Sequence, residues 1–417
     1  MFSIRKAFRR FRASERGDTA IMFALTAIPV ILAAGVGIDY ANYSAAKTHL
    51  QAALDGAALA GAAASGKTDS ERVSIASASF TANMGAGAAS GYTLTTDFRV
   101  DSGTFIAEAN VEVPTSLMRL AGIDTMEAAG AAEVGLASMK KAEIAMVLDY
   151  SGSMGDVSGT KVKYIAMREA ATKLVDDLTT ASPGKVKFGL VPFSHHVYVT
   201  LPKAHVKGAS GSGTWTGCTQ DRRYPHNLTA ATPTSSDNTK WNQPMAPEHA
   251  SDGCSGYAPR KLVVKPLTSD SDSVKTQLAG MKPYAWTHIA LGVEFGYHLL
   301  MDNQPFDQAA PKSDTETQKF MIVLTDGMQT EPAFGPGSTR TVSQGEKNLT
   351  QLCTNAKADG IRIITLAFDL DDTSTRARLK ACASDADSFF IADDDADLSK
   401  AFEEIKTAVA SEIYLKK

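Results

Sequence analysis

The residues best placed to do chemistry follow an apolar run in the segment Ala142–Met154. The run AEIAMVL is followed by Asp149, Ser151 and Ser153, which stand at every second position. In a loop that leaves a strand, alternate residues can project to the same side, so one carboxylate and two hydroxyl groups can converge. This all-oxygen set suits a hard cation such as Mg²⁺, with Mn²⁺ or Ca²⁺ as alternatives. The other interpretation is that both serines only cap the next helix.

Further oxygen ligands stand in two later segments. Asp326 ends the apolar run KFMIVLTD and is followed by Gly327, and Thr287 begins the amphipathic segment THIALGVEF. In a doubly wound sheet, ligands bind beyond the carboxyl ends of the strands, where residues from separate segments meet. We therefore expect Thr287 and Asp326 to complete the set begun by Asp149. A simple turn position is the alternative role for Asp326.

Histidines are the best candidates for a catalytic role. His195 and His196 follow Ser194 in the run FSHH, and His288 stands beside Thr287. Adjacent residues of a strand point to opposite faces, so the two histidines of FSHH should not bind one metal together. Neither a G-x-S-x-G nor an H-E-x-x-H motif accompanies them. We expect no catalytic residue, and hence a binding protein rather than an enzyme.

The elements that must position these residues alternate between strands and helices from about residue 140 onward. The apolar runs that predict strands are 142–149, 185–193, 319–325, 361–367 and 388–392. The amphipathic stretches that predict helices are about 160–180, 268–281, 287–301, 343–358, 373–382 and 396–413. Apolar strands between amphipathic helices indicate an α/β fold with a doubly wound, mainly parallel sheet over residues 140–417.

An insertion interrupts this alternation at residues 205–262. The segment is rich in Gly, Ser, Thr, Asn and Pro, and it contains Trp215 and Trp241. A stretch this long without clear elements is typical of a functional or flexible insertion.

Two acidic runs, DLDDT at 369–373 and DDDAD at 393–397, suggest calcium sites at first sight. Each immediately precedes a predicted helix, where carboxylates accept hydrogen bonds from free N–H groups and interact favourably with the helix dipole. Capping is therefore the role we expect.

The chain has four cysteines, and none lies in a C-x-x-C pair, which disfavours zinc binding. All four follow a predicted membrane anchor, described next, that would place them outside the cytoplasm, and an even number in an exported segment suggests two disulfides. Of the three possible connectivities, we favour the pairing of sequence neighbours, Cys218 with Cys254 and Cys353 with Cys382. Four free buried thiols are the alternative.

A membrane anchor is predicted near the N-terminus. Residues 1–18 carry six basic side chains against two acidic ones, and residues 19–38 contain no charge. Twenty uncharged residues can cross a bilayer as a helix, and residues 39–46 contain no Lys or Arg, which places the N-terminus in the cytoplasm. A cleaved signal peptide is the alternative. The whole chain has a net charge of −4, which argues against a nucleic-acid partner.

Between the anchor and the α/β domain we expect two parts. Residues 39–65 continue the helix and are Ala-rich, with a heptad-like stripe that packs either on its own domain or on a partner helix. Residues 66–139 read as a small α+β module with a short helix at about 70–83 and a hairpin across the turn DSG. No chemistry is visible in this module.

The C-terminal motifs resemble a known site. D-x-S-x-S, a threonine before a helix and T-D-G, in this order on an alternating α/β pattern, look like the metal-ion-dependent adhesion site of von Willebrand factor A-like domains. The resemblance implies that Asp149, Ser151 and Ser153 bind the metal. It implies that Thr287 binds it directly or through water, and Asp326 mostly through water. An acidic side chain from a partner would then fill the open metal position.

The N-terminal segment resembles TadE/TadG-like proteins of the bacterial Flp (tight-adherence) pilus system. The similar features are the Arg-Gly before the apolar run, the Asp-Tyr after it and the run LQAALDGAALA. An anchor with a C-terminal adhesion-type domain is similar to TadG. Met22 stands five residues after Gly17, where pilin-like members carry a Glu at the processing site, so we expect the anchor to be retained.

Together these resemblances imply a single-pass protein of the bacterial inner membrane, with its α/β domain in the periplasm or cell envelope. The implied function is pilus assembly or adhesion through a metal-dependent site. Its partner would be another Tad component or a surface ligand that offers a carboxylate. A scaffold with a non-functional metal site and a metal-assisted envelope hydrolase are the alternatives.

Overall fold

The computed structural model describes residues 16–64, 67–88, 92–136, 140–244 and 254–413. They form two compact units that divide at about residue 138. Most of the basic segment 1–18 and part of the insertion 205–262 lie outside the described residues. One helix runs through the expected span and its continuation, so the limits between those parts stay predictions.

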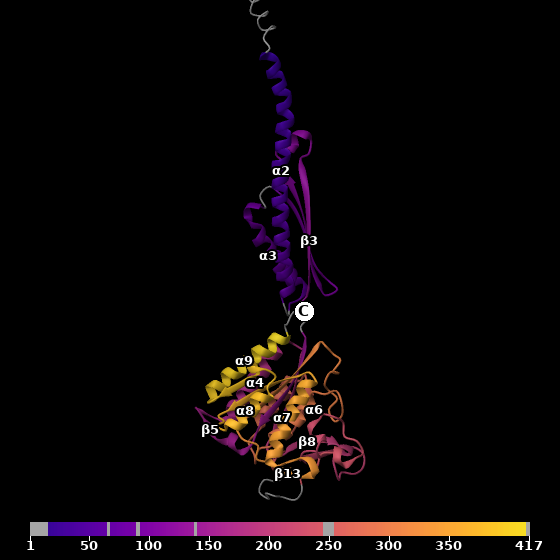
Figure 1. Cartoon of the computed structure of the whole chain (residues 1–417), viewed down its shortest axis with the longest axis vertical. Coiled ribbons are helices and arrows are strands. Elements are labelled where there is room, and N and C mark those ends of the chain that lie inside the picture. The colour runs from indigo at the N-terminus through magenta and orange to yellow at the C-terminus, as the bar shows by residue number, and fades with distance from the viewer. Residues whose placement is uncertain (1–15, 65–66, 89–91, 137–139, 245–253, 414–417) are drawn as a thin grey trace, which may run out of the picture. The chain divides into compact units, whose positions relative to one another are not determined.

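The N-terminal unit is built on one long helix, α2 (Arg16–Ala63), drawn in indigo in Figure 1. A second helix, α3 (Asp69–Ala88), packs against it. Three antiparallel strands in the order β1-β2-β3 complete the unit: β1 (Thr93–Asp101), β2 (Thr104–Pro114) and β3 (Thr125–Gly135). The expected short helix and hairpin are therefore present.

The two halves of α2 have different surroundings. In its C-terminal half, Leu50, Leu54 and Ala57 are fully buried and belong to one cluster with Phe105 of β2. The Ala-rich stripe thus packs on its own unit. In the N-terminal half, large apolar side chains such as that of Phe23 are exposed, and the helix is long and apolar enough to cross a membrane.

The C-terminal unit contains a six-stranded sheet in the order β10-β7-β4-β11-β14-β15. Its strands are β4 (Lys141–Asp149), β7 (Val186–Phe193), β10 (Lys265–Thr268), β11 (Thr317–Thr325), β14 (Ile361–Phe368) and β15 (Phe389–Ala392). All neighbours are parallel except the edge pair β10 and β7. Two-residue strands form small ribbons outside the sheet: β5 (Val157–Ser158) with β6 (Lys161–Val162), and β12 (Ala333–Phe334) with β13 (Arg340–Thr341).

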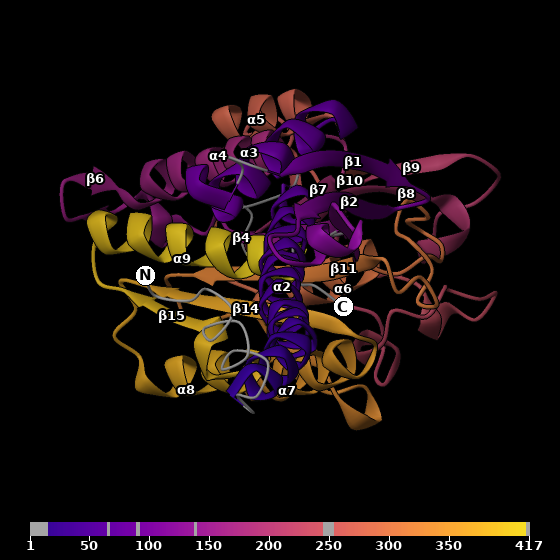
Figure 2. The ribbon, with the colours of Figure 1, turned by 90° about the horizontal axis from the view of Figure 1, so that it is seen from above.

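Helices cover both faces of this sheet, as Figure 2 shows. One face carries α4 (Lys163–Ala181), α5 (Ser271–Gly280) and α9 (Asp395–Ile413), and the other carries α6 (Ile289–Leu299), α7 (Val342–Ala358) and α8 (Thr373–Cys382). Strand β4 is apolar on both sides for this reason: Met146 and Leu148 enter one core cluster, and Ala145 and Val147 enter the other. The doubly wound, mainly parallel α/β fold is confirmed.

The insertion holds more regular structure than its composition indicates. Strand β8 (Val197–Pro202) pairs with β9 (Thr214–Thr219) in an antiparallel hairpin. Beyond the hairpin, the buried Arg222 donates a hydrogen bond of 2.7 Å from Nε to Glu294 Oε1 on α6. Its guanidinium also lies 4.8 Å from the centre of the Trp241 ring. The described part of the insertion is therefore anchored to the helix layer through buried contacts.

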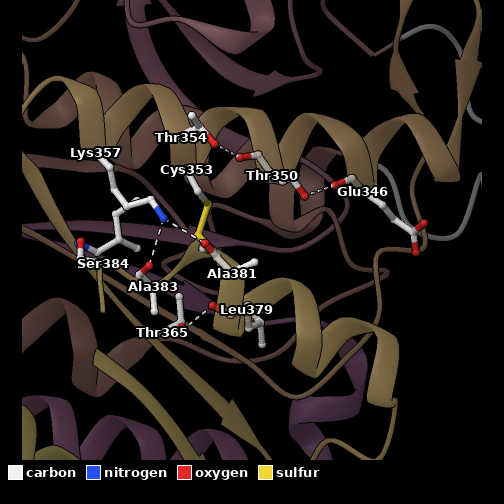
Figure 3. Close-up of a disulfide and its surroundings, with 12 residues drawn as sticks. Glu346, Thr350, Cys353, Thr354, Lys357, Thr365, Leu379, Ala381, Ala383 and Ser384 are labelled. Atoms are coloured by element: carbon white, nitrogen blue, oxygen red, sulfur yellow. Dashed lines mark hydrogen bonds between the residues drawn. A yellow bond between two sulfur atoms is a disulfide. The ribbon is translucent and has the colours of Figure 1, made fainter. Parts of the chain in front are cut away.

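Two disulfides join neighbours in the sequence. Cys218 on β9 is bonded to Cys254, and Cys353 on α7 is bonded to Cys382 at the end of α8. Figure 3 shows the second bond, beside which Lys357 Nζ donates to the carbonyl oxygens of residues 381 and 383 at 2.9 and 3.0 Å. The disulfide and this lysine together hold the C-terminal end of α8 to α7.

Candidate metal site

The site begins at the carboxyl end of β4. Asp149 is fully buried there, and both of its carboxylate oxygens are held by neighbours. The Ser151 N–H donates to Oδ1 at 2.7 Å, and the Thr325 hydroxyl at the end of β11 donates to Oδ2 at 2.6 Å. Because β4 and β11 are parallel neighbours, their ends meet at one edge of the sheet. This pairing fixes the orientation of the carboxylate before any ligand binds.

Two serines connect Asp149 to Asp326. The hydroxyl oxygens of Ser151 and Ser153 lie 3.1 Å apart, and Ser153 Oγ donates to Asp326 Oδ1 at 2.7 Å. Ser151 precedes the short helical turn Gly152–Gly155, but its side chain makes no capping hydrogen bond. The structure therefore contradicts the capping interpretation for Ser151, since its hydroxyl faces Ser153 instead.

Thr287 belongs to the same cluster. It lies in the loop before α6, and its N–H donates to Thr330 Oγ1 at 2.8 Å. A Cβ atom on Gly327 would lie 3.4 Å from Thr287 Oγ1 and 3.7 Å from Ser153 Oγ. The two hydroxyl groups therefore flank the glycine that follows Asp326. The five residues expected from sequence thus come from three separate segments and meet at one place.

A cavity of about 500 Å³ opens over this cluster. Ser151, Ser153, Thr287 and Gly327 are among the residues that line it, together with the exposed side chain of Met328. The hydroxyl-bearing residues therefore line the cavity, whereas Asp149 and Asp326 are buried behind them and are not among its lining residues. Among the described residues, no three His, Cys, Asp or Glu side chains gather as a metal-binding group, so a cation here would depend on the hydroxyl oxygens.

Electrostatics favour a cation at this place. Burial is the main cause that raises the pKa of Asp149 to about 7, and the negative charge of Asp326 is the second cause. Burial also raises the pKa of Asp326, although the Ser153 hydroxyl and the ammonium of Lys163 lower it. Two buried carboxylates this close to each other are destabilised as anions, and a bound dication would relieve that cost. The all-oxygen donor set therefore fits Mg²⁺ or another hard cation.

Lys163 is a member of the site that the sequence did not indicate. Its Nζ lies 3.1 Å from Asp326 Oδ2 and 2.9 Å from Asp369 Oδ2. Burial alone would lower its pKa, but the ion pairs with both carboxylates raise it, so the ammonium stays charged. Lys163 is the first residue of α4, and a lysine at a helix start carries no pattern that would reveal a partner 163 residues away. Only its burial in the folded protein distinguishes Lys163 from an ordinary surface lysine at a helix start.

The histidines lie close to this edge of the sheet in structural roles. His195 and His196 follow the end of β7 and lie in the turn before β8, with their ring centres 4.0 Å apart. The expectation that they point to opposite faces of a strand is therefore wrong, because the strand ends at Phe193. Tyr257 OH lies 2.8 Å from His195 Nδ1 and 2.6 Å from the Ser194 hydroxyl.

His288 caps a helix. Its Nδ1 accepts a hydrogen bond of 3.1 Å from the Leu291 N–H in the first turn of α6. Burial lowers the pKa of His288 to about 3, and burial likewise lowers the pKa of His196. Both imidazoles are therefore neutral at physiological pH and packed inside the unit.

The acidic runs also act as helix caps. Asp372 Oδ1 accepts from the Thr375 N–H at 2.6 Å at the start of α8. Asp394 Oδ1 accepts from the N–H groups of Ala396 and Asp397 at 2.9 and 2.8 Å at the start of α9. The capping prediction is confirmed for both runs.

Comparisons with known proteins agree with this architecture. Residues 17–64 match the family model described as Flp pilus-assembly TadE/G-like, and residues 257–404 match the model of the von Willebrand factor type A domain. The chain joins a TadE/G-like segment to a von Willebrand factor type A domain. The second match includes Thr287 and Asp326 but begins after the D-x-S-x-S run. In the structure, the run starts at the end of β4, which lies beside β11 in the same sheet, so it stands next to Asp326.

Several solved structures are similar to this chain. One is the pilus adhesin SpaC of Lactobacillus rhamnosus GG in its open conformation, at 14% identity over 78% of this chain and 34% of that chain, with a TM-score of 0.40. Another is the vWF domain of the type V pili tip protein Mfa5 of Porphyromonas gingivalis, at 13% identity over 67% and 98%, with a TM-score of 0.42. Proximal thread matrix protein 1 of the mussel byssus, with a zinc-occupied MIDAS motif, has 15% identity over 66% and 46%, with a TM-score of 0.36. This chain spans about a third of the length of the SpaC chains, and no curated protein matches it.

Proposed function

We propose that this protein is a membrane-anchored Tad pilus component, of the TadG type, that captures a protein partner through a divalent cation. The cation would be held by Asp149, Ser151, Ser153, Thr287 and Asp326. The observation that carries the proposal is the meeting of these five residues, from three segments, at the carboxyl ends of two adjacent parallel strands.

The donor set of the site supports binding to an acidic partner. Of the residues proposed to hold the cation, only Asp149 and Asp326 are charged, and Asp326 also pairs with the Lys163 ammonium, which Asp369 shares. The other three ligands would be neutral hydroxyl groups, so a dication bound there would keep a coordination position for one more anionic oxygen. A carboxylate from a partner, entering through the open cavity, would supply that oxygen ligand.

The surroundings of the site favour binding over catalysis. A hydrolase would need a nucleophile or base poised at the cavity. His196 and His288 are buried and neutral, and His288 is engaged as a helix cap. The Ser194 hydroxyl is hydrogen-bonded to Tyr257. We therefore propose a non-enzymatic role.

The proposed location follows from the N-terminal unit and the cysteines. The exposed apolar half of α2 would cross the inner membrane once, with the basic N-terminus in the cytoplasm. The α/β domain would then lie in the periplasm or cell envelope. Two disulfides and no free cysteine among the described residues suit such an oxidising compartment.

The test compares partner capture by the wild type and by Asp149→Ala. The full chain is solubilised in detergent, immobilised and incubated with envelope extract in Mg²⁺ or in EDTA. We expect a set of acidic partners that binds the wild type in Mg²⁺ only and does not bind Asp149→Ala. The control is Asp272→Ala, which removes a carboxylate that is 90% exposed on α5. Equal capture by the wild type in EDTA and in Mg²⁺ would refute the proposal.

One observation favours a second candidate, a scaffold whose site holds no cation. The Lys163 ammonium already forms an ion pair with the Asp326 carboxylate, and this pair could stabilise the edge of the sheet without a metal. A chain truncated after residue 139 separates the two functions in a strain that lacks the protein. Restored pilus formation would favour the scaffold, and continued loss would favour the metal-dependent domain.

A further inference from the structure

A carboxylate at the end of the predicted span holds a distant loop. Asp39 of α2 is buried, although it directly follows the apolar stretch 19–38. Its two carboxylate oxygens accept hydrogen bonds from the N–H groups of Ser116, Leu117 and Met118, at 2.9, 2.9 and 2.7 Å. These residues belong to the loop that joins β2 to β3, here called the interfacial loop (residues 115–124). The loop is therefore fixed at the level on α2 where the apolar span ends.

The interfacial loop also contacts α2 on the N-terminal side of Asp39, within the apolar span. A Cβ on Gly35 would lie 2.5 Å from Leu117 Cβ, so the loop packs closely against the helix at this glycine. Gly35 stands three residues before Ile38, the last residue of the uncharged stretch. At a rise of about 1.5 Å per residue, Leu117 thus lies about 4.5 Å inside the apolar span. In Figure 1 the loop lies against α2 at the end of β3 that points to the N-terminal half of the helix.

The backbone of the loop is suited to an apolar environment. Asp39 binds the N–H groups of residues 116–118, and those of residues 120, 122 and 123 are bound within the loop. Leu120 N donates to Leu117 O at 3.1 Å, Gly122 N to Arg119 O at 3.0 Å and Ile123 N to Met118 O at 3.2 Å. Thr115 N donates to Asp124 O at 3.0 Å and closes the base of the loop. Irregular backbone enters a lipid phase only when its polar groups are satisfied in this way.

The side chains at the tip of the loop are exposed and apolar. Leu120 is 74% exposed and Ile123 is 44% exposed. The charged neighbours Arg119 and Asp124 form an exposed ion pair of 3.8 Å, a position from which both can reach lipid headgroups. Exposed large apolar groups beside a membrane span are costly in water and favourable at the lipid interface.

We propose that the interfacial loop enters the outer headgroup and acyl-chain boundary of the bilayer and forms a second membrane contact beside α2. The contact would fix the rotation and height of the helix and hold the β-sheet of the N-terminal unit next to the membrane. This inference depends on the proposed membrane anchor, but it requires more, because an anchor alone would leave the loop in water.

The test measures the depth of one label at three positions of the full chain. Leu120→Cys, Ser102→Cys and Phe23→Cys are made separately and labelled with a thiol-reactive NBD fluorophore, since the native cysteines are paired in disulfides. Each protein is reconstituted in vesicles of phosphatidylethanolamine and phosphatidylglycerol. A nitroxide on the lipid acyl chain, close to the headgroup, is the quencher inside the bilayer, and iodide is the quencher in water.

Ser102 and Phe23 are the matched controls. Ser102 is exposed at the hairpin turn between β1 and β2, and about 35 Å of strand β2 separates it from the interfacial loop. Phe23 is exposed in the apolar half of α2. We expect nitroxide quenching at Leu120 to be at least about twofold stronger than at Ser102, with iodide quenching correspondingly weaker.

The outcomes separate this inference from the anchor itself. Quenching by nitroxide at both Phe23 and Leu120 supports the inference. Quenching at Phe23 together with iodide access at Leu120 overturns it and leaves the anchor intact. Protection of Leu120 from both quenchers also overturns it, because a second protein copy would then cover the loop. Absence of nitroxide quenching at Phe23 would refute the anchor and the inference together.

Discussion

Lys163 competes for the same carboxylate that the proposed cation would use. Its ammonium lies 3.1 Å from Asp326 Oδ2, and Asp326 Oδ1 accepts from Ser153. A cation that binds at this site must share Asp326 with Lys163 and tolerate its positive charge. In the variant Lys163→Met, the long apolar side chain keeps most of the packing volume while the charge is lost. The variant should therefore bind Mg²⁺ more tightly than the wild type.

The size of the effect follows from the ion pair. A hydrogen bond between charged groups contributes about 1.5–3 kcal/mol to the state in which it forms. Lys163 also pairs with Asp369 at 2.9 Å, so its ammonium can keep one partner when a cation draws on Asp326. The lower end of the range therefore applies, and each 1.4 kcal/mol corresponds to about a tenfold change in affinity. We expect Mg²⁺ to bind Lys163→Met about tenfold more tightly.

Isothermal titration of the detergent-solubilised full chain with MgCl₂ measures this affinity directly. Lys161→Met is the matched control, because Lys161 carries the same charge two residues away but pairs with the exposed Glu169 at 2.6 Å. Its Kd should equal that of the wild type. An unchanged or weaker affinity in Lys163→Met, with both variants folded, would show that Lys163 does not compete with the cation and would refute this account of the site.

Two further predictions concern the packing that supports the fold. Arg222→Met should lower the free energy of unfolding by about 3–5 kcal/mol, because it leaves Glu294 buried without a partner, whereas the double variant with Glu294→Leu should recover most of the loss. Burial raises the pKa of Glu294 to about 8 although Arg222 lowers it, and without Arg222 this pKa should rise further. The part of the stability loss in Arg222→Met that comes from the ionised carboxylate should therefore grow as the pH rises above about 8 and should stay constant and small below it. Urea unfolding followed by tryptophan fluorescence, which reports only on the C-terminal unit, measures both effects, and equal losses in the single and double variants would contradict them. Gly61→Ala should destabilise the N-terminal unit by about 1–3 kcal/mol, because its Cβ would lie 2.6 Å from the ring of Phe105. Gly37→Ala, which has no atom within 4 Å of its new Cβ, should leave unfolding by circular dichroism unchanged, and equal melting of both variants would contradict the packing argument.

The regular elements of the sheet could be predicted because their signals are local. The apolar run before Asp149 predicted a strand at 142–149, and β4 spans Lys141–Asp149. Amphipathic periodicity predicted a helix at 396–413, and α9 spans Asp395–Ile413. Burial of both faces of the sheet produces these patterns, so the pattern and the layered fold have the same physical cause.

The insertion could not be predicted in this way. Its order comes from contacts between distant residues, namely the Cys218–Cys254 disulfide and the buried ion pair of Arg222 with Glu294. No local periodicity records such contacts. The two adjacent histidines show the same limit, because the alternation rule applies only while the chain remains a strand, and β7 ends at Phe193.

The sequence by itself indicated the candidate ligand types and the places of Asp149 and Asp326 at the ends of strands, because oxygen-bearing residues after apolar runs are visible in one dimension. Only the tertiary structure decided which neighbours tune that site. Lys163 reaches Asp326, and Thr325 reaches Asp149, across the edge of a sheet whose strand order places β4 beside β11. In the N-terminal unit, the sequence indicated an apolar helix, but only the fold showed that Asp39 holds a loop 77 residues away at the end of that span. Charge and hydropathy are properties of single residues, whereas a pairing between distant residues exists only once the chain has folded.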